Sequence, residues 1–360
     1  MKKRTKILAW LGGIAAVLVV AGFALVWVLG PTMGAMLTGK PIFLVPPSPE
    51  RYASAALDLM EGQGIHGDSP EFAEARAEAE RMLDSADLKD YSDTWPALDL
   101  AINAAGGKHS KVLRPDGGNG TGGSGSADAE PTVTSEPAQG EGGTGDGGNG
   151  DGDGARVLTA TVPTHGGDGG GPESQRYADA LASGIAREVK AGACGAIVDL
   201  RGNNGGDMGP MVAGLSALLP DGELLWFDGR GYSTAVTLTG GSIQGGGSNI
   251  TVDAGPKAEI PVAVLVDGGT ASSGEATMLT FRGLDGSRSF GAPTAGYASA
   301  NMTHEFPGGA KLMLTVAKDR DRTGAVHMDD PVEPDEVTGQ SPEDAKTAAL
   351  AWLSTRGCGR

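Results

Sequence analysis

An uncharged apolar run from Ile7 to Gly30 constrains this chain most strongly. The run, ILAWLGGIAAVLVVAGFALVWVLG, is long enough to cross a bilayer as a helix. Four basic residues precede it: Lys2, Lys3, Arg4 and Lys6. Because the positive-inside rule keeps such cations in the cytoplasm, we expect residues 1–30 to form a cytoplasmic stub and a single-pass anchor in the cell membrane. The remainder is then extracytoplasmic.

A cleaved signal peptide is the alternative interpretation of this run. The apolar stretch exceeds the usual signal core of about 7 to 15 residues, and no clean small-x-small cleavage site follows it. These features favour an uncleaved anchor. No cysteine lies near the run, so the sequence predicts no lipoprotein anchor.

The chain is strongly acidic, with a formal net charge of −17 that becomes −21 once the four N-terminal cations are set aside. Such a surface repels nucleic acid and attracts cations, including cationic peptides, although solubility alone is the simpler explanation. The two cysteines, Cys194 and Cys358, could pair in an oxidising compartment. Cys194 lies in the apolar stretch GACGAIVDL, so a buried free thiol is the alternative.

Composition divides the region after the anchor into three parts. Residues 31–48, which end in PIFLVPPSP, read as an extended tether. Residues 49–107 carry apolar side chains at helical spacing, with Ser69 as an N-cap, and predict a small helical subdomain. Residues 115–154 are rich in Gly, Asp, Glu, Ser and Thr, and Val133 is their only large apolar residue. We expect a flexible acidic insertion, acting as a lid or as a spacer.

Residues 155–356 alternate between predicted strands and helices. The strands are ARVLTATVPTH, GAIVDL, ELLWFDG and PVAVLVDG, and the helices cover residues 173–190, 208–219 and 274–283. Alternation of this kind predicts an α/β core in which helices cover the strands.

Two adjacent serines, Ser272 and Ser273, lie between a buried strand and a helix start in the stretch GGTASSGEAT. At such a junction the first backbone N–H groups lack helical partners and the helix dipole favours negative charge. A serine here could be a simple N-cap, or it could be a nucleophile beside an anion-stabilising site.

A glycine-rich turn, DLRGNNGGDM, follows another predicted buried strand. Gly205 and Gly206 have no side chain to block a ligand, so their amides could form part of an oxyanion hole. Many such turns carry glycine and asparagine only to make the bend, so this motif is weak by itself.

Together these motifs carry a family resemblance. The pair DLRGNNGG and TASSGE, followed by FGAPTAG and PVEPD, resembles the C-terminal processing, or tail-specific, serine peptidases. The resemblance covers residues 108–353, with 108–114 as the start of the catalytic domain. It implies a crotonase- or ClpP-like spiral of ββα units and a serine nucleophile. Aligning the serine motif puts that nucleophile on Ser272, with the Ser273 amide as an oxyanion donor.

One departure concerns the general base. Tail-specific members close the G-x-P-T-x-G motif with a lysine, whereas this chain has Tyr297 there. His109, followed by a serine, resembles the base of the tricorn-like and nisin-resistance-protein branches, which use serine and histidine. The nisin-resistance branch also has a membrane anchor, a helical subdomain, a T-A-S-S motif and no PDZ domain. His165 is the reserve candidate, and the remaining histidines, His66, His304 and His327, are expected at the surface or in packing.

The identity of a third catalytic member is open. Glu275 could stabilise the site or merely complement the helix N-terminus, and Asp330 and Glu333 are further candidates. No histidine or cysteine cluster has metal-ligand spacing, so no metal or cofactor is predicted. The resulting hypothesis is acyl transfer on a peptide or an unstructured protein tail. The alternatives are a non-catalytic peptide-binding protein, which the missing lysine favours, and a processing peptidase for membrane-protein tails.

Overall fold

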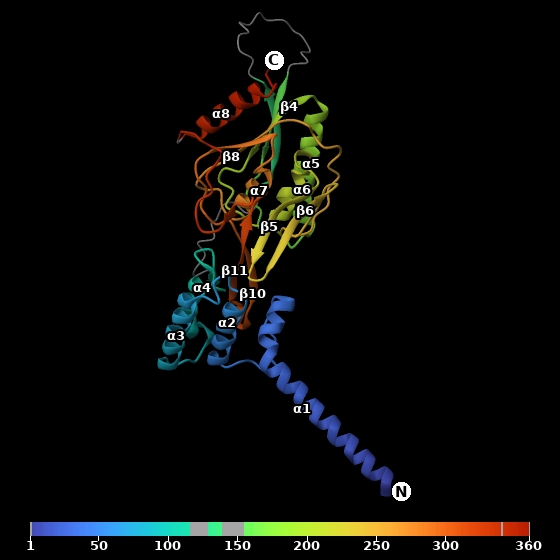
Figure 1. Ribbon diagram of the computed structural model, residues 1–360, viewed down its shortest axis with the longest axis vertical. Coiled ribbons are helices and arrows are strands. Elements are labelled where there is room, and N and C mark those ends of the chain that lie inside the picture. Colours follow the sequence, from blue (N-terminus) through green and yellow to red (C-terminus); the bar gives the residue numbers. More distant parts are fainter. Residues whose placement is uncertain (1, 116–128, 139–154, 340, 360) are drawn as a thin grey trace, which may run out of the picture. The chain divides into compact units, whose positions relative to one another are not determined.

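The computed structural model describes residues 2–115, 129–138, 155–339 and 341–359 (Figure 1). Within the first helix the side chains of residues 14, 18 and 20 onward are described. Contacts divide the chain into two compact units, residues 1–120 with 301–316 and residues 121–300 with 317–360.

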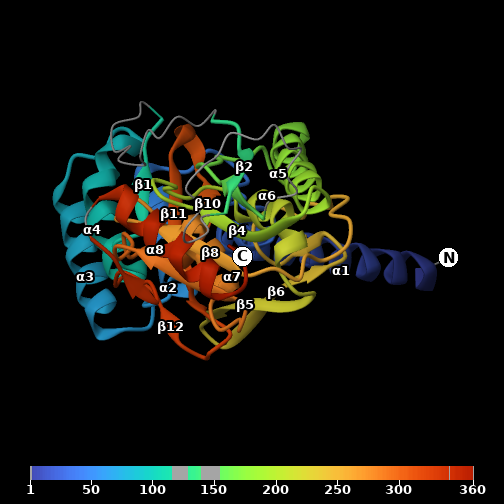
Figure 2. The same cartoon turned by 90° about the horizontal axis from the view of Figure 1, so that it is seen from above.

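The first unit is mainly helical, as the sequence predicts. Its elements are α1 (Lys2–Thr38), α2 (Pro49–Gln63), α3 (Pro70–Ser85), η1 (Tyr91–Thr94), α4 (Trp95–Gly106), β1 (Lys111–Leu113) and the η3 turn (Pro307–Gly309), with parts of β10 (Ser299–Glu305) and β11 (Lys311–Arg320). Ser69 is the expected N-cap of α3 and accepts a hydrogen bond from the Phe72 N–H at 3.1 Å. Helices α3 and α4 lie side by side (Figure 2). Their buried apolar faces form one core with α2 and β11.

Helix α1 continues through Pro31 to Thr38. Proline leaves the carbonyl four residues earlier without its helical donor. That carbonyl, of Trp27, accepts a hydrogen bond from Arg51 Nη2 at 2.5 Å, and the Arg51 guanidinium lies 3.6 Å from the centre of the Trp27 ring. Because Arg51 satisfies the freed carbonyl, the helix persists, and the prediction of an extended tether over 31–48 was wrong for residues 31–38.

The described part of α1 contains one stretch, Val20–Thr38, that is apolar and long enough to cross a membrane. Length and composition alone do not separate an anchor from a signal sequence. The end of this stretch packs against the chain that follows it. The Ile42 N–H donates to the Gly30 carbonyl at 3.2 Å, and a Cβ on Gly34 would collide with Ile42.

A six-stranded sheet organises the second unit. Its strand order is β13-β9-β8-β4-β3-β2, parallel except for the edge pair β3–β2. The bounds are β2 (Thr132–Pro137), β3 (Arg156–Thr161), β4 (Ala193–Asp199), β8 (Val262–Val266), β9 (Ser287–Gly291) and β13 (Glu336–Val337). The carboxyl ends of parallel strands meet at one edge of a sheet, so the turns after β3, β4, β8 and β9 are neighbours.

Helices cover both faces of this sheet. They are α5 (Pro172–Lys190), α6 (Met208–Gly214), the η2 turn (Ser216–Leu218), α7 (Ser273–Phe281) and α8 (Pro342–Thr355). Side chains alternate along the strands: Val264 belongs to the core with α5 and α7, whereas Leu265 belongs to the core with α8. Figure 1 accordingly shows α5 and α8 on opposite sides of β4 and β8.

A disulfide between Cys194 and Cys358 joins the start of β4 to the end of the chain. The sequence left open whether these cysteines pair or Cys194 is a buried free thiol, and in the structure they are paired. The adjoining core contains Leu353 and Phe290, which are fully buried.

Antiparallel strands complete the second unit. They are β5 (Gly222–Gly229), β6 (Tyr232–Thr239), β7 (Ser242–Gln244) and β12 (Val326–His327). Strand β5 pairs with β6 and with residues 317–320 of β11, and helix α7 contacts both β5 and β8. The mixed α/β architecture is as predicted.

Two further domain boundaries differ from the sequence prediction. Residues 132–137, predicted as part of a flexible insertion, form β2, because their backbone pairs with the open edge of β3 and Val133 packs on Gly184 of α5. The rest of the predicted insertion falls largely outside the described residues. Residues 108–114, assigned to the catalytic domain, belong to the helical unit, because Val112 pairs with Leu312 and is fully buried.

Candidate active site

Ser272 occupies a strained turn between β8 and α7. Its backbone has φ +53° and ψ −119°, and it is the one non-glycine residue with positive φ in the described part of the chain. Such a conformation costs about 1–3 kcal/mol and persists only where the surroundings enforce it. The side chain is partly exposed, so the hydroxyl is held in an unusual direction yet open to solvent.

The glycine turn after β4 approaches this serine closely. A Cβ added to Gly205, whose φ is +108°, would lie 2.8 Å from Ser272 Cβ and 3.2 Å from its Oγ. Gly206, with φ +111°, would clash with the His165 carbonyl if it carried a Cβ. Only glycine fits at these two positions, and the two motifs singled out in the sequence do meet in space.

The two glycine amides differ in what they bond. The Gly205 N–H donates to Asn203 Oδ1 at 2.9 Å. The N–H groups of Gly206 and Ser273 donate no hydrogen bond to any residue that the structure describes. Of the predicted donors, Gly206 and Ser273 therefore retain the capacity to bind an oxyanion, whereas Gly205 supplies the close approach.

Asn203 is a residue whose role the sequence did not reveal. It is fully buried, its Nδ2 donates to the Val162 carbonyl at 2.8 Å, and its own carbonyl accepts the Ala271 N–H at 2.9 Å. Through its side chain and its backbone carbonyl, this one residue links the end of β3, the glycine turn and the turn before Ser272. Its position in DLRGNNGG suggested only a bend, because a turn asparagine and a cross-linking asparagine look alike in a sequence.

Glu275 ties the nucleophile turn to the loop after β9. Its Oε2 accepts the N–H groups of Ser272 at 2.7 Å and Tyr297 at 2.8 Å, and its Oε1 accepts the Gly296 N–H at 2.8 Å and the Thr294 hydroxyl. Burial raises the pKa of Glu275, and these four hydrogen bonds lower it only in part. The geometry is that of a group that positions Ser272.

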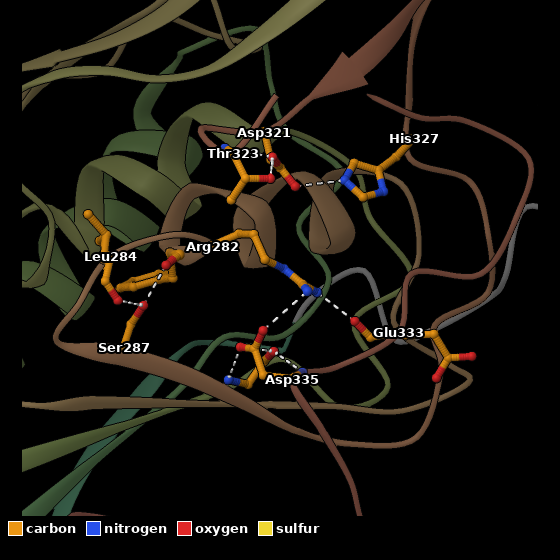
Figure 3. Close-up of polar contacts among 10 residues, drawn as sticks. Arg282, Leu284, Ser287, Asp321, Thr323, His327, Glu333 and Asp335 are labelled. Atoms are coloured by element: carbon orange, nitrogen blue, oxygen red, sulfur yellow. Dashed lines mark hydrogen bonds and ion pairs between the residues drawn. The ribbon is translucent and has the colours of Figure 1, made fainter. Parts of the chain in front are cut away.

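The PVEPD segment contacts the site through Thr294. The Val332 N–H donates to Thr294 Oγ1 at 2.8 Å, so this segment reaches Glu275 through one threonine. The side chains of Asp330 and Glu333, predicted as possible third members, are exposed. Figure 3 shows the Glu333 carboxylate turned away from the neighbouring pair Arg282–Asp335, while its backbone carbonyl accepts from Arg282 at 2.5 Å.

The same close-up shows a histidine engaged with a buried carboxylate. His327 Nε2 lies 2.8 Å from Asp321 Oδ2, and Thr323 donates to the other oxygen of Asp321 (Figure 3). Burial would raise the pKa of Asp321, but the hydrogen bonds from Thr323 and His327 lower it below its usual value. This cluster closes the turn after β11, in keeping with the packing role expected for His327.

The two candidate bases have different surroundings. His165 is buried, its Nε2 lies 3.1 Å from Ser174 Oγ, and its ring centre lies 4.5 Å from that of Tyr177. His109 is buried in the first unit, where burial and the charges of Lys111 and Lys108 lower its pKa to about 4. His109 and Ser272 belong to different units, so their pairing remains a prediction. His304 is fully buried and His66 is partly exposed.

Comparisons with known proteins agree with the fold and the motifs. The model of Peptidase family S41 matches residues 172–338, which include Ser272 and the glycine turn. The nisin-resistance protein of Lactococcus lactis subsp. lactis is 36% identical over 88% of this chain and 90% of its own length.

Solved structures give the same picture. A lipoprotein from Streptococcus agalactiae is 25% identical, with a TM-score of 0.68 over 88% of this chain and 99% of its own. A photosystem II D1 C-terminal processing protease, 14% identical, shares the fold with a TM-score of 0.57 over 85% of this chain and 98% of its own. The chain therefore belongs to Peptidase family S41 and is a serine peptidase.

Proposed function

We propose that this protein is a membrane-anchored, extracytoplasmic endopeptidase that hydrolyses cationic antimicrobial peptides through an acyl-enzyme on Ser272. The observation that carries the proposal is the strained, partly exposed Ser272 beside Gly205, with two uncommitted backbone N–H groups next to it. Acyl transfer requires a hydroxyl and oxyanion donors that face the same carbonyl group, and these neighbouring groups could supply both.

In the proposed reaction His109 accepts the proton of the Ser272 hydroxyl while Oγ attacks the peptide carbonyl carbon. The Gly206 and Ser273 N–H groups stabilise the oxyanion of the tetrahedral intermediate. Collapse breaks the C–N bond, and the leaving amine takes the proton from His109. Water then attacks the ester, giving up a proton to His109, and Ser272 Oγ leaves with that proton.

The low pKa of His109 bears on this role. A neutral imidazole can accept a proton, and a pKa of about 4 keeps His109 neutral throughout the physiological range. Such an imidazole is a weaker base than an exposed one, but it is not lost to protonation in mildly acidic surroundings.

Three observations support the extracytoplasmic location. An apolar stretch of α1 follows basic residues at the start of the sequence, the chain carries a disulfide, and a similar solved structure is described as a lipoprotein. Disulfides persist mainly outside the cytoplasm. Membrane retention of the intact chain after alkaline extraction tests the anchor, and release of a form lacking residues 1–30 would instead identify a signal peptide.

Charge and similarity together support the proposed substrate class. A chain with a net charge of −17 attracts cationic peptides, and a relative 36% identical is named for resistance to nisin. Nisin is therefore the first substrate to test.

The test uses the full-length chain in detergent micelles, with nisin digestion followed by mass spectrometry and Ser272→Ala as the matched control. We expect nisin fragments from the wild type and none from the variant, since loss of the nucleophile removes nearly all turnover. Intact nisin combined with labelling by a fluorophosphonate would reject this substrate but retain the peptidase. Protection of cells by Ser272→Ala at wild-type level would identify a peptide-binding protein, the alternative that Tyr297 in place of lysine favours.

A further inference from the structure

The hydroxyl of Ser273 is committed to the glycine turn. Its Oγ donates to the Gly206 carbonyl at 2.7 Å, joining the first residue of α7 to the turn after β4. This residue lies directly beside Ser272, yet its hydroxyl is occupied, which distinguishes the two serines chemically.

The glycine turn needs such restraints. Gly205 and Gly206 both have strongly positive φ and no Cβ, so the peptide planes around them can rotate with little steric resistance. An oxyanion donor is effective only if its N–H is fixed in direction before the reaction. The Gly206 N–H belongs to the peptide group between Gly205 and Gly206, and rotation of that group would remove one of the two uncommitted donors.

Four hydrogen bonds restrain successive peptide groups of the turn. Asn203 accepts the Gly205 N–H, and the Gly205 carbonyl accepts the His165 N–H at 3.3 Å. The peptide group that follows Gly206 is held at both of its polar atoms, since the Ser273 hydroxyl donates to the Gly206 carbonyl and the Asp207 N–H donates to the His165 carbonyl at 2.7 Å.

We infer that Ser273 is a positioning residue: by holding the Gly206 carbonyl, its hydroxyl fixes the glycine turn against the start of α7 and so keeps the Gly206 N–H and the Ser273 N–H at a fixed separation for one oxyanion. The inference rests on the proposed function, because it assumes that Ser272 is the nucleophile and that Gly206 is a donor. It gives Ser273 a role in transition-state stabilisation, in addition to any role at the start of a helix.

The test compares Ser273→Ala and Ser273→Thr with the wild type and with Ser272→Ala. Ser354→Ala is a matched control, since Ser354 Oγ also donates to a backbone carbonyl, that of Ala351 at 2.8 Å, in α8. The readouts are the second-order rate of fluorophosphonate labelling and, on nisin, kcat and KM separately. Thermal unfolding midpoints establish that all variants are folded.

We expect Ser273→Ala to lower the labelling rate and kcat by about 10- to 100-fold, less than the 10²- to 10³-fold loss of a whole donor, with KM within about threefold. Ser273→Thr keeps the hydroxyl, so its labelling rate and its kcat should both lie within about threefold of the wild-type values. Ser354→Ala should have the same labelling rate and kcat as the wild type.

Labelling of Ser273→Ala at the wild-type rate would overturn the inference while leaving the peptidase intact. Labelling of Ser272→Ala but not of Ser273→Ala would exchange the roles of the two serines and overturn it as well. If the wild type is neither labelled nor active, the proposed function itself fails, and the inference with it.

Discussion

The two ends of the parallel strands β4 and β8 are stabilised in different ways. At the carboxyl ends, the glycine turn and the Ser272 turn are fixed by hydrogen bonds to single buried side chains, Asn203 and Glu275. At the amino end of β4, Cys194 is bonded covalently to Cys358, and the surrounding core is apolar.

The difference separates chemistry from stability. Hydrogen bonds to one side chain define direction, which an oxyanion site needs, whereas a cross-link and apolar packing resist unfolding without orienting any reacting group. Substitutions at the carboxyl ends should therefore change turnover, whether or not they also change stability, and substitutions at the amino ends should change stability alone. The predictions below test this division, beginning with the largest effect.

The first prediction concerns the general base that accepts the proton of Ser272. The two candidates are His165, which follows the carboxyl end of β3, and His109, which lies in the helical unit. We expect His109→Gln to lower kcat/KM by about 10³-fold or more, because Ser272 then lacks a proton acceptor. The matched His165→Gln should stay within about tenfold, since glutamine can still bond Ser174. Steady-state kinetics on a cleaved peptide provide the measurement, and the reverse ranking would assign the base to His165.

A pH profile sharpens the same comparison. The pKa of His109 is lowered to about 4, so its basic form is present at every pH above that value. The acid limb of kcat/KM should therefore have its midpoint near pH 4, well below the usual value of about 6.5 for histidine. A midpoint near 6.5 would contradict a buried His109 as the base.

The second prediction tests the amino end of the sheet. Replacing both cysteines, Cys194→Ala with Cys358→Ala, should lower the free energy of unfolding by about 2–4 kcal/mol, because the bond spans 164 residues of chain. Below the unfolding transition kcat/KM should remain unchanged. Urea unfolding and kinetics on the same preparation check both parts, and an equal loss of turnover in the folded variant would break the proposed division.

The third prediction tests a polar contact at the carboxyl end. Glu275→Gln replaces one of two acceptor oxygens by an NH2 group that faces N–H donors, so we expect a loss of about 2 kcal/mol in stability. Fluorophosphonate labelling should slow by about 10- to 100-fold as the Ser272 turn relaxes. Glu173→Gln, in the exposed first turn of α5, is the control and should cost less than about 0.5 kcal/mol. Equal effects of the two variants would remove Glu275 from the site.

Local sequence patterns predicted the elements around the site well. The strand before Ser272, the helix after it and the glycine turn follow from an apolar run, a helix-start signal and a Gly-Asn cluster, which act over a few residues. The Ser69 cap and the α5 helix are of the same kind. Each depends on neighbours in the chain, so one sequence suffices.

Features that depend on distant partners could not be predicted. The acceptor role of Glu275 needs the loop at 294–297, and the cross-link by Asn203 needs Val162. Strand β2 forms from a polar segment because β3 offers an open edge, and α1 continues past Pro31 because Arg51 reaches the carbonyl of Trp27. In each case tertiary structure overrides local propensity.

The last prediction concerns Asp319, a buried carboxyl group on β11 near Glu275. Its side chain is about 1% exposed, and its Oδ1 has no hydrogen-bond partner among the described residues. Burial raises the pKa of Asp319 well above its usual value, and the charge of Glu275 raises it further. The unfolded chain releases this proton near pH 3.9, whereas the folded chain keeps it, so the free energy of unfolding falls as pH rises above that value.

Asp319→Asn stays neutral at every pH and should remove this pH-dependent loss. We therefore expect the variant to be more stable than the wild type at pH 8 and nearly equal to it at pH 3.5. Urea unfolding at both pH values, with the exposed Asp330→Asn as the control, provides the measurement. A variant less stable than the wild type at pH 8 would mean that the Asp319 carboxylate is ionised and paired in the folded chain. The surroundings of Glu275 would then hold a buried charge in addition to their hydrogen bonds.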